Sequence, residues 1–187
     1  MNTTTPLANQ FLIAMPGLGD PNFFRTVTLV CEHSAEGAMG IIINRPVDLT
    51  LGDVFQQLDI ADPGGPATGQ VVYLGGPVQN NRGFVLHEPL GAYESTLAVS
   101  ETLGVSTSRD ILTAIANSKG PTHFLLALGY AGWGPGQLEQ ELADNAWLSV
   151  PASSEILFDT PAEARWSAAA HLLGVDMAQL SGDAGHA

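Results

Sequence analysis

The chain has 187 residues, 45% of them apolar, which is enough to build a core and excludes an intrinsically disordered protein. Six basic side chains against nineteen acidic ones give a formal net charge of −13. Because binding to duplex DNA depends on Lys and Arg that neutralise phosphates, this charge disfavours direct nucleic-acid binding. The length suits a single domain over residues 1–187, with residues 1–9 and 181–187 expected to be mobile tails.

Cysteine usage and the lengths of the apolar runs indicate where the protein acts. Cys31 is the single cysteine, so no internal disulfide can form and a reducing compartment is expected. Residues 1–10 carry no Lys or Arg, so we expect no secretory signal. The longest nearly apolar run, residues 124–133, is far shorter than the ~18–20 residues needed to cross a membrane. We therefore expect a cytoplasmic protein with no membrane partner.

Apolar runs and alternation predict the strands, which dominate the first half of the chain. In chain order they are expected at residues 10–15, 26–33, 39–44, 71–74, 82–88, 96–99, 122–128 and 155–158. The short connection at residues 34–37 predicts an antiparallel hairpin between the second and third of these strands. The fourth and fifth strands are expected to pair with each other across the Gly75-Gly76-Pro77 turn.

Capping residues predict helices at residues 51–58, 108–117, 135–145 and 161–173. Thr50 and Asp53 form a weak capping box for the first helix. The last helix has the clearest start, with Thr160 as its cap and Glu163 three residues later. Because strands lead and helices are interspersed without a regular βαβ repeat, we predict an α+β fold with a curved, mainly antiparallel sheet and peripheral helices.

Many short motifs in a fixed order resemble the AlgH/YqgE family of bacterial proteins, whose function is not assigned. The motifs are Gln10-Phe-Leu-Ile-Ala-Met-Pro16, Cys31-Glu-His33, Gly37-Ala-Met-Gly40, Asn44-Arg-Pro46, Gly75-Gly-Pro-Val78, Arg82-Gly-Phe-Val-Leu-His87, Leu128-Gly-Tyr-Ala-Gly-Trp133, Gly136-Gln-Leu-Glu-Gln-Glu141, Asn145-Ala-Trp-Leu148, Phe158-Asp159, Arg165-Trp166 and Gly185-His-Ala187. The resemblance implies a bifurcated sheet curled into a pseudo-barrel and an association with the regulation of alginate genes. It implies no catalytic residue.

Half of the basic side chains attach to the predicted strands and turns of the first half. If the sheet curls, these arginines could face one rim and bind a small anion or an acidic partner. The alternative is a structural role, in which each arginine pairs with a local carboxylate or donates to a backbone carbonyl, and we favour that alternative. The candidate ligand-binding or anion-binding group is Arg25, His33, Asn44, Arg45, Gly75, Gly76, Arg82 and His87.

Histidine and cysteine side chains suggest two further kinds of site, a metal site and a nucleophile with its base. His33, His87 and His123 lie at strand ends and could converge on a metal with Glu32 or Glu88, but no zinc-type spacing exists and structural histidines are favoured. Cys31 and His33 are expected on the same strand face as a conceivable nucleophile and base. At about 6.6 Å between Cα atoms two residues apart on a strand, a direct hydrogen bond is difficult, and a core cysteine is favoured.

The glycine-rich segment at Gly129, Gly132, Gly134 and Gly136 lies between a predicted strand and a predicted helix. Helix N-termini attract anions, so the segment raises the question of phosphate binding. Its spacing matches neither the dinucleotide-binding fingerprint nor the P-loop. We interpret it as a tight turn with Trp133 packed beneath it.

These observations favour a non-catalytic cytoplasmic protein that binds a protein or small-molecule partner, with an indirect role in transcriptional regulation. We predict no catalytic residue, no cofactor and no metal. The alternative is a small hydrolase or transferase that acts through His33, His87 and the arginines. A pocket where those side chains converge would favour the enzyme. A filled sheet interior would favour the binding protein.

Overall fold

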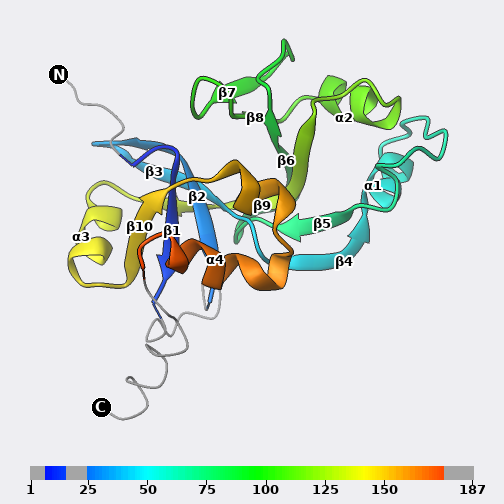
Figure 1. Cartoon of the computed structure of the whole chain (residues 1–187). Helices are drawn as coiled ribbons and strands as arrows, with labels where there is room; N and C mark the ends of the chain where they lie inside the picture. Colours follow the sequence, from blue (N-terminus) through cyan, green and yellow to red (C-terminus); the bar gives the residue numbers. More distant parts are fainter. Residues whose placement is uncertain (1–6, 16–24, 175–187) are drawn as a thin grey trace.

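The strand β9 (His123–Trp133) organises the sheet of the computed structural model, which describes residues 7–15 and 25–174 (Figure 1). Of the expected tails, residues 1–6 and 181–187 lie outside the described residues, and residues 7–9 form a turn. The other strands are β1 (Gln10–Ala14), β2 (Val27–Ser34), β3 (Gly37–Ile42), β4 (Pro46–Thr50), β5 (Val71–Leu74), β6 (Val78–Glu88), β7 (Thr96–Ala98), β8 (Gly104–Ser106) and β10 (Trp147–Pro151). The helices are α1 (Leu51–Gln57), α2 (Arg109–Ala116), α3 (Gln137–Ala143) and α4 (Arg165–His171).

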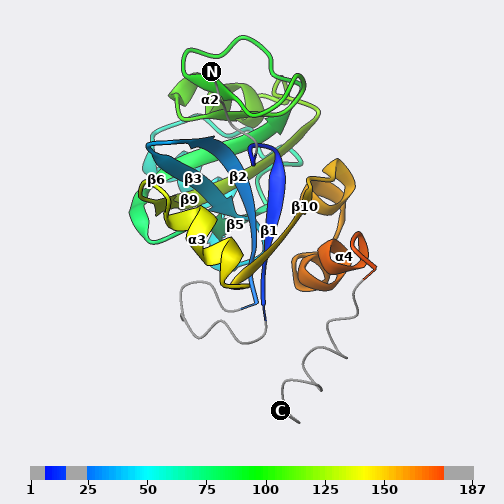
Figure 2. The same ribbon diagram turned by 90° about the vertical axis from the view of Figure 1, so that its left-hand side faces the viewer.

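The sheet branches at β9. Its main path runs β10-β1-β2-β3-β9-β6-β8-β7, and β5 also pairs with β9 and carries β4. β3 bonds to the end of β9 at Ala131–Trp133, whereas β5 bonds to its middle at Ala127 and Leu128. All pairings are antiparallel except that of β5 with β9, and the branched sheet curls so that its strands cross in Figure 2. The predicted α+β fold with a curved, mainly antiparallel sheet is confirmed.

Strand pairing agrees with one sequence prediction and overturns another. β2 and β3 form the predicted antiparallel hairpin, with Ser34 opposite Gly37. The predicted pairing of β5 with β6 is wrong, because β9 lies between them, parallel to β5 and antiparallel to β6. Proximity in sequence suggested a hairpin, but the continuous apolar run of β9 is buried on both faces and takes both strands as neighbours.

The core consists of three apolar clusters on the faces of the sheet. The first lies between β1, β2, β3, β6, β9 and α4 and includes Phe11, Leu29, Ile41, Leu86 and Trp166. The second lies beneath α1 and α2 and includes Leu51, Phe55, Val85, Ile111 and Leu126. The third lies beneath α3 and includes Leu12, Val30, Trp133, Leu138 and Trp147. The interior of the curled sheet is therefore filled with side chains.

Helix positions follow the capping prediction in one case and depart from it elsewhere. The Asp53 N–H donates to Thr50 Oγ1 at 3.3 Å and the Thr50 N–H donates to Asp53 Oδ2 at 2.9 Å, which confirms the capping box of α1. The predicted helix at 161–173 instead begins with a 3₁₀ turn at Ala162–Ala164, and α4 starts at Arg165. In the described part of the chain, no helix is long and apolar enough to cross a membrane.

Two segments were predicted wrongly and three strands were missed. The predicted strand at 155–158 is a π-helical turn, Glu155–Asp159, because a short apolar run fits a buried helical turn as well as a strand. The predicted glycine-rich turn begins as strand, since β9 continues through Gly129 to Trp133. The strands β4, β8 and β10 were not predicted; each is five residues or shorter.

Candidate functional site

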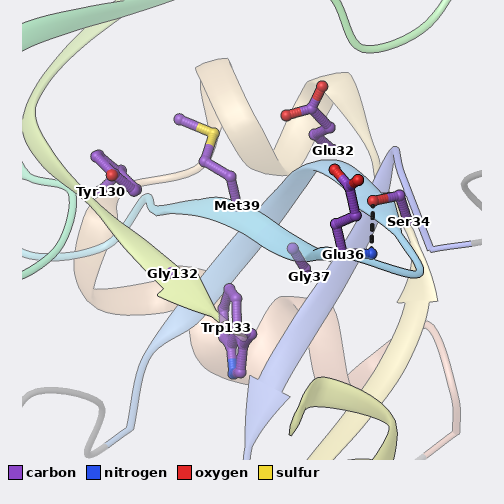
Figure 3. Close-up of a pocket in the computed structure, with 9 residues that line it drawn as sticks. Glu32, Ser34, Glu36, Gly37, Met39, Tyr130, Gly132 and Trp133 are labelled. Atoms are coloured by element: carbon purple, nitrogen blue, oxygen red, sulfur yellow. Dashed lines mark hydrogen bonds between the residues drawn. The ribbon is translucent and has the colours of Figure 1, made fainter. Parts of the chain in front are cut away.

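A hollow of about 530 Å³ lies over the exposed end of β2, β3 and β9 (Figure 3). Its residues come from the β2–β3 hairpin and from the end of β9, and we call it the carboxylate hollow. They are Glu32, Ser34, Glu36, Gly37, Ala38, Met39, Tyr130, Gly132 and Trp133.

The ladder register explains the shape of the carboxylate hollow. Glu32 lies opposite Met39, and Met39 lies opposite Gly132 on β9. Figure 3 shows Glu32 and Met39 projecting to one side of the hairpin, while Trp133 points to the other. Glu32, Met39 and Gly132 are thus neighbours across three strands, and the absence of a side chain at Gly132 leaves a gap on β9. A Cβ added at Gly132 would meet only Tyr130 Cε2, at 3.6 Å.

The hairpin turn holds Glu36 at the rim of the carboxylate hollow. The Glu36 N–H donates to Ser34 Oγ at 3.1 Å, and Gly37 has φ +136°. A Cβ at Gly37 would lie 2.2 Å from the Trp133 carbonyl oxygen, so this close approach of β3 to β9 requires glycine. These contacts of the turn therefore fix the position of the Glu36 backbone at the rim of the carboxylate hollow.

Two carboxylates face this hollow without a cationic partner. Glu32 and Glu36 are exposed, and neither forms an ion pair with a side chain in the described part of the chain. The thioether of Met39 and the ring of Tyr130, both half-buried, line the same hollow. Carboxylates that share a hollow with an aromatic ring and a soft sulfur favour a cation, because each of these groups presents negative potential. Chemically, this is a place for an ammonium or guanidinium group.

A β-bulge separates Cys31 from His33. The register with β3 shifts between Val30 and Glu32, so Cys31 packs in the first core cluster while His33 faces α3. The expectation that these two side chains share a face is wrong, because the bulge adds one residue to the alternation. Burial raises the pKa of the Cys31 thiol, with Glu32 adding to the effect. The structure thus confirms a core cysteine.

His33 is held by helix α3. Its Nε2 lies 3.1 Å from Glu139 Oε2, and the side chain is buried. Its Nδ1 is also buried and has no hydrogen-bond partner among residues 7–15 and 25–174. The pKa of Glu139 is lowered, chiefly by the hydrogen bond from its own backbone N–H and further by His33. His33 therefore anchors α3 and does not reach the carboxylate hollow on the opposite face.

His87 lies at the far end of β9 from His33. His87 pairs with Phe124 of β9, whereas His33 pairs with Ala38, which pairs with Trp133. Phe124 and Trp133 are nine positions apart on β9, so the length of strand between them is about 30 Å at the rise of a β-strand. The two histidines are not brought together, so the catalytic arrangement considered for the enzyme alternative does not form.

Both ring nitrogens of His87 are used within the fold. Nδ1 lies 3.0 Å from the Pro89 carbonyl oxygen, which can only accept, so Nδ1 carries the proton. Nε2 lies 2.7 Å from Ser106 Oγ and accepts from that hydroxyl. Burial lowers the pKa of His87. His87 and Ser106 are both fully buried, so this serine–histidine pair is closed to a substrate. Among the described residues, no three His, Cys, Asp or Glu side chains gather as a metal site.

The predicted arginine group is dispersed over the sheet. Arg25 stacks on the ring of Trp166 at 5.1 Å, and Arg82 stacks on Phe84 at 5.6 Å. Arg45 lies directly before β4, and its carbonyl accepts from the Leu74 N–H at 2.8 Å. Arg82 lines a separate, largely apolar groove of about 490 Å³ between α1 and α2.

Three predicted site residues make backbone contacts. Asn44 Oδ1 accepts from the Val27 N–H at 2.9 Å, and its Nδ2 donates to the Arg25 carbonyl at 3.0 Å. Added Cβ atoms at Gly75 and Gly76 would lie 2.4 Å and 2.1 Å from backbone atoms of β9. Their positions are therefore explained by the close crossing of two backbones.

Sequence reasoning missed the residues of the carboxylate hollow and one buried arginine, Arg165. The available signal for the hollow was Glu32, an acid within an otherwise apolar strand, followed by Glu36 in the turn. The bulge that places Glu32 beside Met39 leaves no mark in the sequence. Arg165 stands before Trp166 in a helix pattern, and nothing in that pattern shows that its side chain is buried.

Comparisons with known proteins agree on one family. Residues 11–178 match the family model described as AlgH-like. Relatives named UPF0301 protein from Nitrosococcus oceani and Thioalkalivibrio sulfidiphilus are 58% and 59% identical over 187 residues, covering 100% of each chain. The solution structure of the AlgH protein from Pseudomonas aeruginosa is similar with a TM-score of 0.80 and 52% identity, covering 97% of both chains. The chain therefore belongs to the AlgH-like family.

Proposed function

We propose that this AlgH-like protein is a non-catalytic binding protein of the cytoplasm whose carboxylate hollow receives a basic side chain of a partner protein. The observation that carries the proposal is that Glu32 and Glu36 line one hollow with Met39 and Tyr130, with no cation among the described residues that line it. Any influence on transcription is then indirect and passes through that partner.

The chemistry of the hollow supports a lysine or arginine side chain as the bound group. A guanidinium or ammonium can contact the carboxylates while its alkyl stem lies against the sulfur of Met39 and the ring of Tyr130. The hollow is wide and open, which suits a side chain presented by a partner better than an enclosed metabolite. The formal charge of −13 adds long-range attraction for a basic partner.

The nucleophile candidates support a non-catalytic role. Cys31 is buried and its pKa is raised by burial, so it carries little of the reactive thiolate. Ser106, the hydroxyl beside His87, is also fully buried. A covalent catalyst needs its nucleophile open to a substrate, and neither group meets that requirement.

Because the formal net charge is −13, we expect no direct binding to duplex DNA. Submicromolar affinity for duplex DNA at physiological salt would contradict this part of the proposal.

The test is a binding titration with labelled hexa-arginine and hexa-lysine peptides followed by fluorescence anisotropy. The double variant Glu32→Gln/Glu36→Gln should weaken binding about tenfold, because two charge contacts are lost. The matched control is Glu101→Gln/Glu163→Gln, which removes two exposed acids elsewhere and changes net charge equally. If both double variants weaken binding to the same extent, only overall charge is responsible and the carboxylate hollow is not the site.

A charge-neutral variant tests the shape of the same hollow. Gly132→Leu introduces a side chain into the gap beside Tyr130, where the added Cβ meets no backbone atom within 4 Å. It should weaken peptide binding without altering the net charge or its salt dependence. Unchanged affinity for both peptides would show that the gap at Gly132 takes no part in binding.

A further inference from the structure

Arg165 is a buried cation surrounded by neutral groups. Its side chain is 4% exposed. Nε donates to the Thr160 carbonyl at 2.8 Å, Nη1 donates to the Ile43 carbonyl, and the guanidinium lies 5.1 Å from the centre of the Tyr73 ring. No carboxylate of the described residues forms an ion pair with it. The charge of Arg165 is therefore not neutralised within the described chain.

An arginine cannot relieve this situation by becoming neutral, because the guanidinium group stays charged in proteins. Buried charges are costly unless they are paired, and a protein usually places a carboxylate beside them. Two carbonyl oxygens and an aromatic face offset part of the cost through partial charges. An anion brought to the remaining N–H groups would supply the missing countercharge.

A cavity adjoins this guanidinium. Its volume is about 160 Å³, compared with about 30 Å³ for each molecule of liquid water, so it can hold a small ligand. Arg165, Gln70 and Tyr73 contribute polar side-chain groups. Phe124 and Phe158 contribute apolar walls. These residues come from four separate parts of the chain, which meet where β5, β9, the π-helical turn and α4 pack together.

We propose that this Arg165 cavity binds a small carboxylate with an apolar body. The carboxylate accepts charge-assisted hydrogen bonds from the guanidinium N–H groups that do not bond to the Thr160 and Ile43 carbonyls. The apolar body lies against Phe124 and Phe158, where it removes apolar surface from water. This site is independent of the carboxylate hollow, has the opposite charge preference and uses none of its residues.

The test uses benzoate and its neutral isostere benzamide, with inorganic phosphate as an anion that lacks an apolar body. Binding is measured by ligand-detected NMR and by the ligand-induced rise in melting temperature. Benzoate should bind at least about tenfold more tightly than benzamide, because only the carboxylate interacts with the full charge of Arg165. Equal binding of benzoate and benzamide overturns the proposal, and binding of phosphate alone overturns the class of ligand.

Variants locate the binding without relying on removal of a buried side chain. Val71→Phe adds a ring at the wall of the cavity while leaving Arg165 in place; Val71 is 44% exposed, so the variant should fold. It should weaken benzoate binding at least about tenfold. Val78→Phe is the matched control, since Val78 is 37% exposed on β6 and lies outside the cavity. If Val71→Phe binds benzoate as the control does, the Arg165 cavity is not the site.

Discussion

The two halves of β9 are stabilised by different kinds of contact. Between His123 and Leu128 the side chains alternate between two apolar clusters, with Leu125 in the first and Leu126 in the second. From Gly129 to Trp133 a neighbouring backbone approaches closely at Gly129, Trp133 packs in the third cluster, and Glu141 of α3 accepts from the Trp133 indole. The first half is thus held by apolar packing on both faces, whereas the second half adds close backbone contact and polar anchoring.

This difference explains why the carboxylate hollow lies at the second end. Apolar side chains pack against both faces of the first half, and the hollows beside it, the Arg165 cavity and the groove between α1 and α2, are lined by no carboxylate of the described residues. In the second half, Gly132 leaves a gap that two acids and an aromatic ring surround. Glycine therefore serves two purposes in β9: it admits a crossing backbone at Gly129 and opens a surface hollow at Gly132.

The largest effect is expected where the backbones cross. In Gly76→Ala the new Cβ would lie 2.1 Å from the Tyr130 carbonyl carbon, so β5 and β9 must separate. We expect the free energy of unfolding to fall by at least about 3 kcal/mol. Guanidinium denaturation followed by far-UV circular dichroism measures the change.

Gly132→Ala is the matched control for this prediction. Its Cβ would meet only Tyr130 Cε2, at 3.6 Å, which is ordinary contact. The unfolding free energy should therefore change by no more than about 0.5 kcal/mol. Equal losses in the two variants would mean that glycine is needed along the whole second half of β9 for chain flexibility, and the distinction between crossing and gap would fail.

The sequence predicted the first half of β9 and failed on the second for a physical reason. The apolar run at residues 122–128 can be recognised without knowledge of the partner strands. The glycines of the second half have the composition of a turn, and their role depends on β5, which lies about fifty residues earlier in the chain. Pairings of that range leave no local periodic signal.

The candidate sites were missed for the same reason. The strand β2 was predicted correctly, yet one bulge changed which face Glu32 and His33 occupy. The predicted arginine group assumed a common rim, whereas burial selected Arg165, an arginine that the pattern did not distinguish. Charge and composition restrict the classes of partner, and only the packing shows which charged side chains lack a counterpart.

The next effect concerns the polar anchoring of the second half. Glu141 Oε1 accepts from the indole N–H groups of Trp133 and Trp147, at 3.0 Å and 2.9 Å. Glu141→Leu removes both charge-assisted hydrogen bonds and should lower the unfolding free energy by about 2 kcal/mol. Glu141→Gln keeps one acceptor oxygen without the charge, so we expect a loss of about 1 kcal/mol. Urea denaturation monitored by tryptophan fluorescence measures both.

Another acid near the end of α3 provides the comparison for Glu141. Asp144 is exposed, and within the part of the chain that the structure describes its carboxylate accepts only from the Gln140 side chain. Asp144→Asn should therefore change the unfolding free energy by less than about 0.5 kcal/mol. A loss in this variant as large as that of Glu141→Leu would indicate that the negative charge of the helix matters more than the contact with the two indoles.

The smallest effect tests the first half of β9 through pH. Burial lowers the pKa of His87 below its ordinary value of 6.5. Between that lowered value and pH 6.5 the unfolded chain binds a proton that the folded chain does not, so stability must fall as the pH falls through this range. One group can change the unfolding free energy by at most about 1.4 kcal/mol per pH unit.

Replacing the ring isolates this contribution. His87→Gln should lose the pH dependence just below pH 6.5 while keeping the loss at more acidic pH, where Glu139, whose pKa lies below its ordinary 4.5, becomes protonated and no longer supports folding. Urea denaturation at intervals between pH 8 and pH 4 gives both curves, and the pH 8 points correct for the hydrogen bonds lost with the ring. If the two curves stay parallel from pH 6.5 to pH 5, His87 takes up its proton as readily in the folded chain as in the unfolded one, and the first half of β9 is less closed to water than its packing indicates.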